Sequence, residues 1–292
     1  MNKLITYFLY PVLLSLNIGF IGAALVLSWE LKYAFIWISG FNAIVLLIVE
    51  FVFPLKQEWK MTKKSFVRDL KWMSVTILSI NAVKFFFAFI AIALSRENKG
   101  LFRDSSFIIE SVAIAVIFEF GQYWYHRISH EGKGWIGKWL WSIHVAHHLP
   151  DRVYLLMHPV LHPINTIVIQ VIIQGTFLLL GCRPESIFIF NVLLGLHELF
   201  SHFNVNIKAG PLNYIFIGTE LHRFHHSANL DEAKNYGTFL SLWDIVFGTF
   251  VYRSESIPEK LGVPEPENYP NSSQLIAVMS LPFTKLGNNS EL

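Results

Sequence analysis

Long runs of apolar residues dominate the first third of the chain. Three of them, 5–29, 33–55 and 72–95, each contain at most one charged residue. A helix needs about 20 mostly apolar residues to cross a bilayer, so each run predicts a transmembrane span. A fourth apolar stretch starts near Phe107 and runs towards Tyr125, and we expect it to be a span that ends at the functional site. The first run is longer than the apolar part of a secretory signal, which favours a retained helix.

Two further apolar runs, 164–180 and 187–200, are separated only by a short turn. We interpret them as a helical hairpin that re-enters the membrane. The loop 56–71 carries six basic residues, whereas the loop after the third run carries three, Arg96, Lys99 and Arg103. Basic residues gather on the cytoplasmic side of membrane proteins, so we expect loop 56–71 inside. Threading the spans from there puts the end of the fourth span and both ends of the hairpin on the same cytoplasmic face.

Composition agrees with a chain that is largely embedded in lipid. Of its 292 residues 53% are hydrophobic and only 15% are charged, whereas soluble domains are about a quarter charged. The formal net charge of +2 gives no basic face, so nucleic acid is not expected as a partner. The single cysteine, Cys182, excludes an intramolecular disulfide and, by itself, a four-thiolate zinc site or an iron–sulfur cluster.

Histidine is the residue type that stands out, because all twelve copies fall between His126 and His226. His126 and His130 form H-x-x-x-H, and residues four apart on a helix lie about 40 degrees from each other. Two H-x-x-H-H triples follow, and positions i, i+3 and i+4 share one helical face. About 0.02 such triples are expected by chance in this chain. The triples are His144, His147 and His148, and His222, His225 and His226.

So many neighbouring imidazoles predict a metal centre. They would repel one another if protonated, and they would leave polar nitrogens unpaired if buried near a membrane. A metal ion takes the lone pair of each neutral ring and removes both problems. Eight imidazoles are too many for one tetrahedral zinc but suit two metals with open positions. Iron is favoured over zinc if the substrate is a lipid C–H bond, because zinc has no redox chemistry.

Beyond these boxes, the chain carries HFN at 202–204, HHSAN at 225–229, NYG at 235–237 and WDIVFGTF at 243–250. With these motifs the segment from about 119 to 252 resembles the fatty acid hydroxylase and sterol desaturase superfamily of membrane di-iron oxygenases. The resemblance implies hydroxylation or desaturation of a lipid, such as a sterol or fatty acyl chain, by two iron ions and O2. It also implies an external electron donor, a cytochrome b5-like protein or a ferredoxin with its reductase, and a bacterial inner membrane or the endoplasmic reticulum as the location.

The resemblance also implies a set of site residues. Glu119 stands where the family has an aspartate seven residues before the first box, on the helical face of His126. We expect it to accept from a ligand imidazole or to bind metal, with a carboxylate at the membrane interface as an equal alternative. His158, in an additional His-Pro pair, is a weaker candidate than His162 in HPIN. The implied metal ligands are His126, His130, His144, His147, His148, His162, His202, His222, His225 and His226.

HELFSH at 197–202 invites a zinc-protease interpretation, which the spacing rejects. Zinc proteases use ligands four residues apart, whereas His197 and His202 are five apart and about 140 degrees round a helix. We therefore expect His197 to support a ligand or to fill space. Three basic residues on the site face are candidates for meeting an acidic electron donor, or are ordinary solvated charges: Lys133, Lys138 and Arg152.

The expected architecture is an all-α integral membrane helical bundle with about four transmembrane spans, a re-entrant helical hairpin and a cytoplasmic histidine-rich cap. We divide it into N-terminal transmembrane helices (1–105), a catalytic domain with the histidine boxes (106–252) and a polar cytoplasmic tail (253–292). Two other functions remain open, a zinc-dependent membrane hydrolase acting on lipids and a metal transporter. The ligand number exceeds what zinc catalysis uses, and the boxes lie past the span ends rather than at mid-membrane depth.

Overall fold

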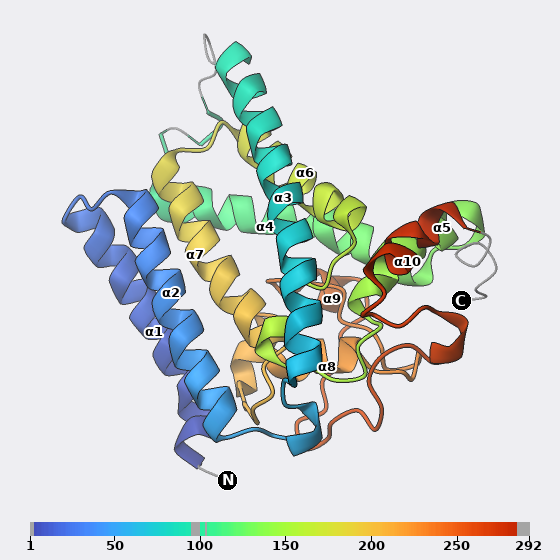
Figure 1. Cartoon of the computed structure of the whole chain (residues 1–292). Coiled ribbons are helices and arrows are strands. Elements are labelled where there is room, and N and C mark those ends of the chain that lie inside the picture. The colour runs from blue at the N-terminus through green and yellow to red at the C-terminus, as the bar shows by residue number, and fades with distance from the viewer. Residues whose placement is uncertain (1–2, 95–99, 103, 285–292) are drawn as a thin grey trace.

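Helices carry the chain from one end to the other (Figure 1). This computed structural model describes residues 3–94, 100–102 and 104–284. Within those ranges β pairing is limited to two isolated bridges, Phe216 with Leu240 and Ser227 with Leu261, so the predicted all-α class is confirmed. The α-helices are α1 Lys3–Val26, α2 Leu31–Val52, α3 Lys63–Leu94, α4 Phe107–Glu131, α5 Gly134–His144, α6 Pro163–Leu180, α7 Pro184–Ser201, α8 Thr219–His225, α9 Leu242–Val246 and α10 Leu275–Ser280. Short 3-10 helices are η1 Gln57–Trp59, η2 Val145–His147, η3 Leu155–Met157, η4 Gly210–Tyr214, η5 Pro266–Asn268 and η6 Leu281–Phe283.

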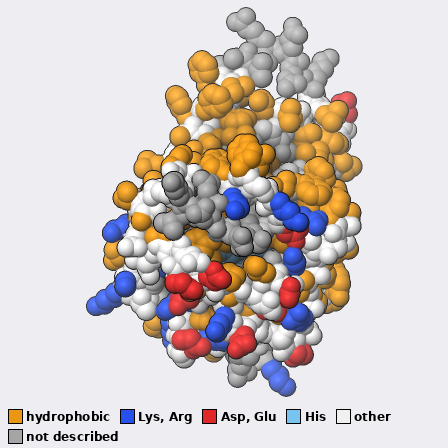
Figure 2. Space-filling view, turned by 90° about the vertical axis from the view of Figure 1, so that its right-hand side faces the viewer, with side chains coloured by type: hydrophobic (Ala, Val, Ile, Leu, Met, Phe, Trp, Pro, Cys, Tyr) orange, Lys and Arg blue, Asp and Glu red, His pale blue; other side chains and the backbone are white. Residues whose placement is uncertain are grey.

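Five helices in the described part of the chain are long and apolar enough to cross a membrane: α1, α2, α3 over Lys63–Ala91, α4 and α6. Four of them correspond to the four predicted spans, and α6 is the first arm of the predicted hairpin. Figure 2 shows hydrophobic side chains gathered over the upper part of one face and charged side chains over its lower part. The chain therefore has the make-up of a multi-pass membrane protein, with one more candidate span than the sequence analysis counted.

Helix α3 starts earlier than predicted and so takes in part of the basic loop 56–71. Thr62 and Ser65 cap its first turn by reciprocal backbone-to-hydroxyl hydrogen bonds of 2.9 and 3.1 Å. Further along, Arg68 donates to the hydroxyl of Tyr154 at 2.7 Å, and the indole of buried Trp72 donates to the carbonyl of Ser272 at 2.9 Å. These contacts stabilise the helical turns before and at the start of the apolar stretch 72–95, which the hydropathy pattern does not register. Ser95, Arg96, Lys99 and Arg103 lie outside the described residues.

The hairpin of α6 and α7 forms the centre of the bundle. Gly181 ends α6 with a φ of 61°, the left-handed C-terminal geometry that glycine adopts without strain, and Pro184 opens α7. Helix α2 packs along α7 and α3 packs along α6, while α4 crosses behind α7 (Figure 1). Asn17 of α1 and Asn42 of α2 exchange two amide hydrogen bonds of 2.9 and 2.8 Å at a buried site. This pair satisfies both amides and joins the first two helices.

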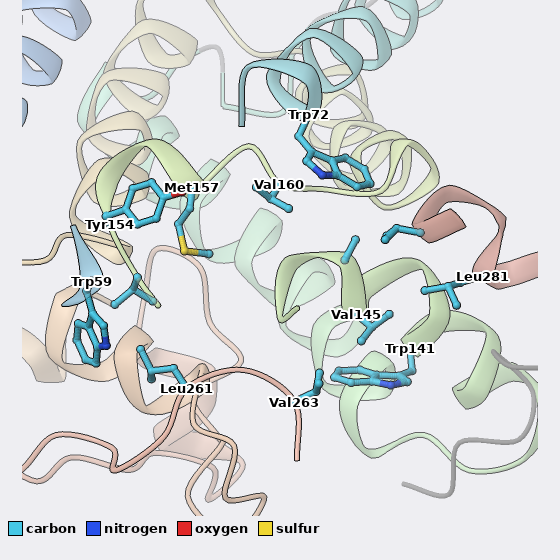
Figure 3. Close-up of a cluster of buried hydrophobic side chains, with 13 residues drawn as sticks. Trp59, Trp72, Trp141, Val145, Tyr154, Met157, Val160, Leu261, Val263 and Leu281 are labelled. Atoms are coloured by element: carbon cyan, nitrogen blue, oxygen red, sulfur yellow. The ribbon is translucent and has the colours of Figure 1, made fainter. Parts of the chain in front are cut away.

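The segment after residue 252 is polar in composition, yet its described part is anchored to the rest of the molecule. Leu261 and Val263 are buried, the first beside Trp59 and the second beside Trp141 (Figure 3). Leu281 of η6 belongs to the same hydrophobic cluster. A few apolar side chains at intervals are enough to hold this segment against the histidine-bearing part of the chain.

Candidate metal centre

Nine histidines converge in two adjacent groups. α4 provides two of them, the segment from α5 to the C-cap of η2 three, the C-cap of α7 one, and α8 with its C-cap three. Within each group the possible ligand atoms lie within 4.8 Å of one another. The rings of His148 and His226 stack with centroids 4.5 Å apart, so the two groups are in direct contact. Cluster A comprises His126, His130, His144, His148 and His225, and cluster B comprises His147, His202, His222 and His226.

Each H-x-x-H-H box divides between the two clusters. In the first box the histidines four residues apart, His144 and His148, belong to cluster A, while His147 belongs to cluster B. The second box does the reverse, with only His225 in cluster A. We had expected each triple to act from one helical face. Consecutive residues on a helix point about 100 degrees apart, so the two adjacent histidines of each box face different clusters and the box bridges both.

The ring nitrogens approach one another closely enough to share a metal ion. In cluster B the Nε2 atom of His202 lies 3.1 Å from that of His147 and 3.0 Å from those of His222 and His226. In cluster A the corresponding Nε2 separations are 3.0–3.2 Å. Lone pairs converging in this way repel one another, and a cation at the centre turns the repulsion into ligation. The donor set therefore fits two metal ions.

Contacts on the outer side of the rings fix which nitrogen carries the hydrogen. Three of the Nδ1 atoms face backbone carbonyls: His126 faces Tyr236 at 2.7 Å, His147 faces Val160 at 3.3 Å, and His225 faces Lys234 at 3.1 Å. A carbonyl can only accept, so each Nδ1 donates its hydrogen and each Nε2 keeps its lone pair for the cluster. The Nδ1 atom of His144 similarly faces the Oδ1 atom of Asn165 at 3.2 Å.

Two buried carboxyl groups hold the loop that carries the Tyr236 carbonyl. Glu119 on α4 accepts from the backbone N–H groups of Thr238 and Phe239. Asp244 on α9 accepts from those of Tyr236 and Gly237 at 2.8 and 2.7 Å. The partners of Glu119 are therefore backbone groups rather than an imidazole. Its link to the site passes through the loop to the Tyr236 carbonyl and so to His126.

Each residue of the NYG motif has a structural role in the same loop. Asn235 has a φ of 61°, and its amide donates to the carbonyls of Leu221 and Val251 at 3.0 and 2.9 Å. A Cβ atom at Gly237 would lie 2.5 Å from the carbonyl oxygen of Leu240, so only glycine fits there. The asparagine sets the turn, the tyrosine presents its carbonyl, and the glycine permits the close approach.

Burial keeps the clustered histidines neutral. Burial, with the neighbouring imidazoles, lowers the pKa of His147 to about 3 and holds the pKa of His148 and His225 well below the ordinary value. Neutral imidazole is the form that binds a metal. Of the nine, only His130 is not fully buried.

Three other histidines lie outside the two clusters. His162 caps α6: its Nδ1 atom accepts from the backbone of Ile164 at 3.1 Å, and its Nε2 atom donates to the carbonyl of Met279 at 3.0 Å. Both ring nitrogens of this predicted ligand are thus occupied by backbone groups. Within HPIN the residue that reaches a cluster histidine is Asn165, which no spacing in the sequence singles out.

His197 and His158 have different surroundings. His197 donates from Nδ1 to the carbonyl of Leu193 and accepts at Nε2 from the hydroxyl of Tyr10, both at 2.7 Å. It therefore joins α1 to α7, as expected for a residue that fills space. The Nδ1 atom of His158 lies 3.3 Å from the Nδ1 atom of His202, which makes His158 an outer neighbour of cluster B.

Comparison with known proteins places this constellation in a family. Residues 111–249, which contain all nine clustered histidines, match the model of the fatty acid hydroxylase family. The matching segment, just under half of the chain, therefore resembles a family of oxidoreductases. No solved structure matches the chain.

Three relatives show the range of the similarity. The ornithine lipid hydroxylase of Rhizobium tropici is 37% identical over 137 residues, which are 46% of this chain and 40% of the relative. Human alkylglycerol monooxygenase is 30% identical over 177 residues, 55% of this chain and 35% of the relative. Rat methylsterol monooxygenase 1 is 28% identical over 139 residues, 47% of this chain and 45% of the relative. The chain thus spans less than half of the length of each of them.

Proposed function

We propose that the chain is a membrane-bound non-haem di-iron oxygenase that hydroxylates or desaturates a lipid with O2 and two electrons from an external donor. The observation that carries this proposal is the convergence of nine buried imidazoles in two adjacent clusters. Four segments of a membrane protein would not bring so many lone pairs together without a pair of metal ions to receive them.

The donor spacing favours iron over zinc. With metal–nitrogen bonds of about 2.1 Å, neighbouring ligands lie about 3.0 Å apart at right angles and about 3.4 Å apart in a tetrahedron. The Nε2 separations of 3.0–3.2 Å match the right-angled arrangement better. Cluster A also offers five imidazoles, one more than a tetrahedral zinc accepts. These features suit a metal of higher coordination number with redox chemistry.

Bound iron would supply O2 activation, which no side chain in the site can provide. Outer contacts to backbone carbonyls orient His126, His147 and His225, and Asn165 orients His144. Burial limits the access of water to both clusters. We propose the nine clustered histidines as the ligands and leave His162 as the cap of α6. Hydroxylation of one C–H bond consumes one O2, two electrons and two protons and yields one alcohol and one water. Desaturation consumes the same reactants and yields one alkene and two waters.

The substrate is proposed to be a lipid that reaches the site from within the membrane. The relatives are named for an ornithine lipid, an alkylglycerol and a methylsterol, which share a long apolar part. Apolar helices lie directly beside the histidine clusters, so such a molecule would not have to leave the bilayer. The basic loop 56–71 supports a cytoplasmic position for the clusters.

The test begins with metal content per chain, measured on protein purified without oxygen after expression in iron-rich medium. We expect near two irons in the parent and fewer in His147→Ala, which changes cluster B, and in His225→Ala, which changes cluster A. The parent is then incubated with ¹⁸O2, a reductase system and an ether lipid, an ornithine lipid or a sterol. A lipid alcohol carrying ¹⁸O is the expected product for hydroxylation. Stoichiometric zinc with no iron and no O2 uptake would overturn the proposal in favour of a zinc-dependent hydrolase.

A further inference from the structure

A cavity of about 440 Å³ lies against cluster A. Its wall includes a cluster histidine, His130. His130 is also the one clustered histidine that is not fully buried. The remaining wall comes from the end of α4, the start of α5 and the loop before Tyr236: Glu131, Gly132, Lys133, Gly134, Lys138, Leu230, Ala233, Lys234 and Tyr236.

The cavity reaches a ligand ring but not the space between the ligands. The Nε2 atom of His130 is buried and has no hydrogen-bond partner, so it is free to face the cluster while another edge of the ring lines the cavity. A substrate carbon would have to pass this ring to meet a metal ion. An electron would need only contact with the ring, because the imidazole of His130 would be a ligand of the metal ion held by cluster A. The cavity is thus suited to electron transfer and closed to substrate.

The rim of the cavity is positively charged. Glu131 is its only acidic wall residue, and it is already paired with Arg127 and Lys234 at 2.7 Å each. Lys133 and Lys138 form no ion pair within the described part of the chain and are left to meet charges from outside. Since the net charge of the whole chain is only +2, this concentration is local. Arg152, the third basic candidate from the sequence, already forms an ion pair with Asp151 and donates to the carbonyl of Glu58.

We propose that this cavity is the docking site of an acidic one-electron carrier protein, which passes electrons into cluster A through the ring of His130. The inference rests on the proposed oxygenase function and adds the place at which the donor binds. Two carrier molecules in turn are each oxidised by one electron, and the two electrons, with two protons from water, balance one O2 per alcohol and water formed. A carrier with carboxylates around its redox group matches Lys133 and Lys138.

The experiment compares the parent with Lys133→Glu/Lys138→Glu in the full chain loaded with iron. A matched control, Lys64→Glu/Lys260→Glu, reverses two exposed lysines elsewhere. The rate at which an acidic [2Fe–2S] ferredoxin is oxidised is followed by stopped flow at several salt concentrations. We expect the second-order rate constant of the cavity variant to fall at least about tenfold at low salt and the difference to shrink at high salt, with the control close to the parent.

Chemical reduction separates this inference from the proposed function. Dithionite needs no docking site, so a single turnover driven by dithionite should give the same amount of lipid product in all three proteins. Equal ferredoxin rates in the parent and the cavity variant, or an equal loss in the control, would overturn the docking site while leaving the oxygenase intact. Absence of product from the parent with dithionite would instead count against the oxygenase itself.

Discussion

Replacing Glu119 by alanine would test how the fold holds cluster A. The substitution removes the acceptor of two backbone N–H groups, that of Thr238, which is part-buried, and that of Phe239, which is buried. Each such group costs about 1–3 kcal/mol, so we expect the free energy of unfolding to fall by about 2–6 kcal/mol. The same loop presents the Tyr236 carbonyl to His126, and loss of such an outer contact lowers metal affinity by about 10- to 100-fold.

The assay is removal of metal by a graded series of chelator concentrations, with metal content per chain and thermal unfolding measured on the same samples. In Glu119→Ala we expect one metal to leave at a chelator concentration about 10- to 100-fold below that needed for the parent, and the second to stay. Glu119→Gln keeps one acceptor oxygen and should lie between the two. Glu110→Gln is the matched control, since Glu110 lies on the same helix but binds Arg183 and Ser186. It should lower stability and leave metal binding unchanged.

Two outcomes would refute this reasoning. If Glu119→Gln kept both metals at parental affinity and parental stability but lost turnover, Glu119 would act directly in the chemistry. If Glu110→Gln released metal as readily as Glu119→Ala, the effect would come from general destabilisation of α4 and not from the loop.

Three further predictions concern other parts of the molecule. His158→Leu should lower the affinity of one metal by about tenfold, because His202 loses its outer partner, whereas His158→Asn keeps an acceptor and should restore it; equal affinities in a chelator titration would contradict this. In metal-free protein burial holds the folded-state pKa values of His147, His148 and His225 below the unfolded value of about 6.5, so the folded state binds fewer protons. Stability should therefore fall with pH below about 6.5, by up to about 1.4 kcal/mol per pH unit for each imidazole such as His147, and an unfolding temperature that is flat from pH 7 to 5 would be incompatible with it. Finally, Asn17→Leu alone should destabilise more than Asn17→Leu/Asn42→Leu, since the single change strands a buried amide; chemical unfolding of the two variants compares them directly, and additive losses would count against the reciprocal pair.

Local spacing was sufficient to identify the histidines but not to sort them. The i, i+4 pairs lie on one helical face whatever the rest of the chain does, so His126 with His130 was predictable from the sequence. The separation of His147 from His148 into different clusters depends on where α7 and α8 place their own histidines. That arrangement depends on tertiary packing, so the spacing within one box does not predict which cluster each histidine joins.

The same limit applies to the surrounding residues. The spacing places Glu119 seven residues before His126 on one helix, but its partners, Thr238 and Phe239, come from a loop far along the chain. His162 and Asn165 are three residues apart, and only the start of α6 determines that the second one turns towards the site. Hydropathy located the apolar spans, while the early start of α3 depends on polar contacts such as Arg68 with Tyr154, which hydropathy does not measure.

The hairpin of α6 and α7 lies in sequence between the two halves of each cluster. Cluster B needs His147 from before the hairpin and His202 from after it, and cluster A likewise needs His148 and His225. Both clusters can therefore assemble only in a chain whose hairpin has returned to the side from which it left. A bound metal would act as a cross-link that closes this loop and disfavours any misthreaded form. A chain inserted with the wrong threading would not form the clusters. It would therefore bind no metal and would be inactive.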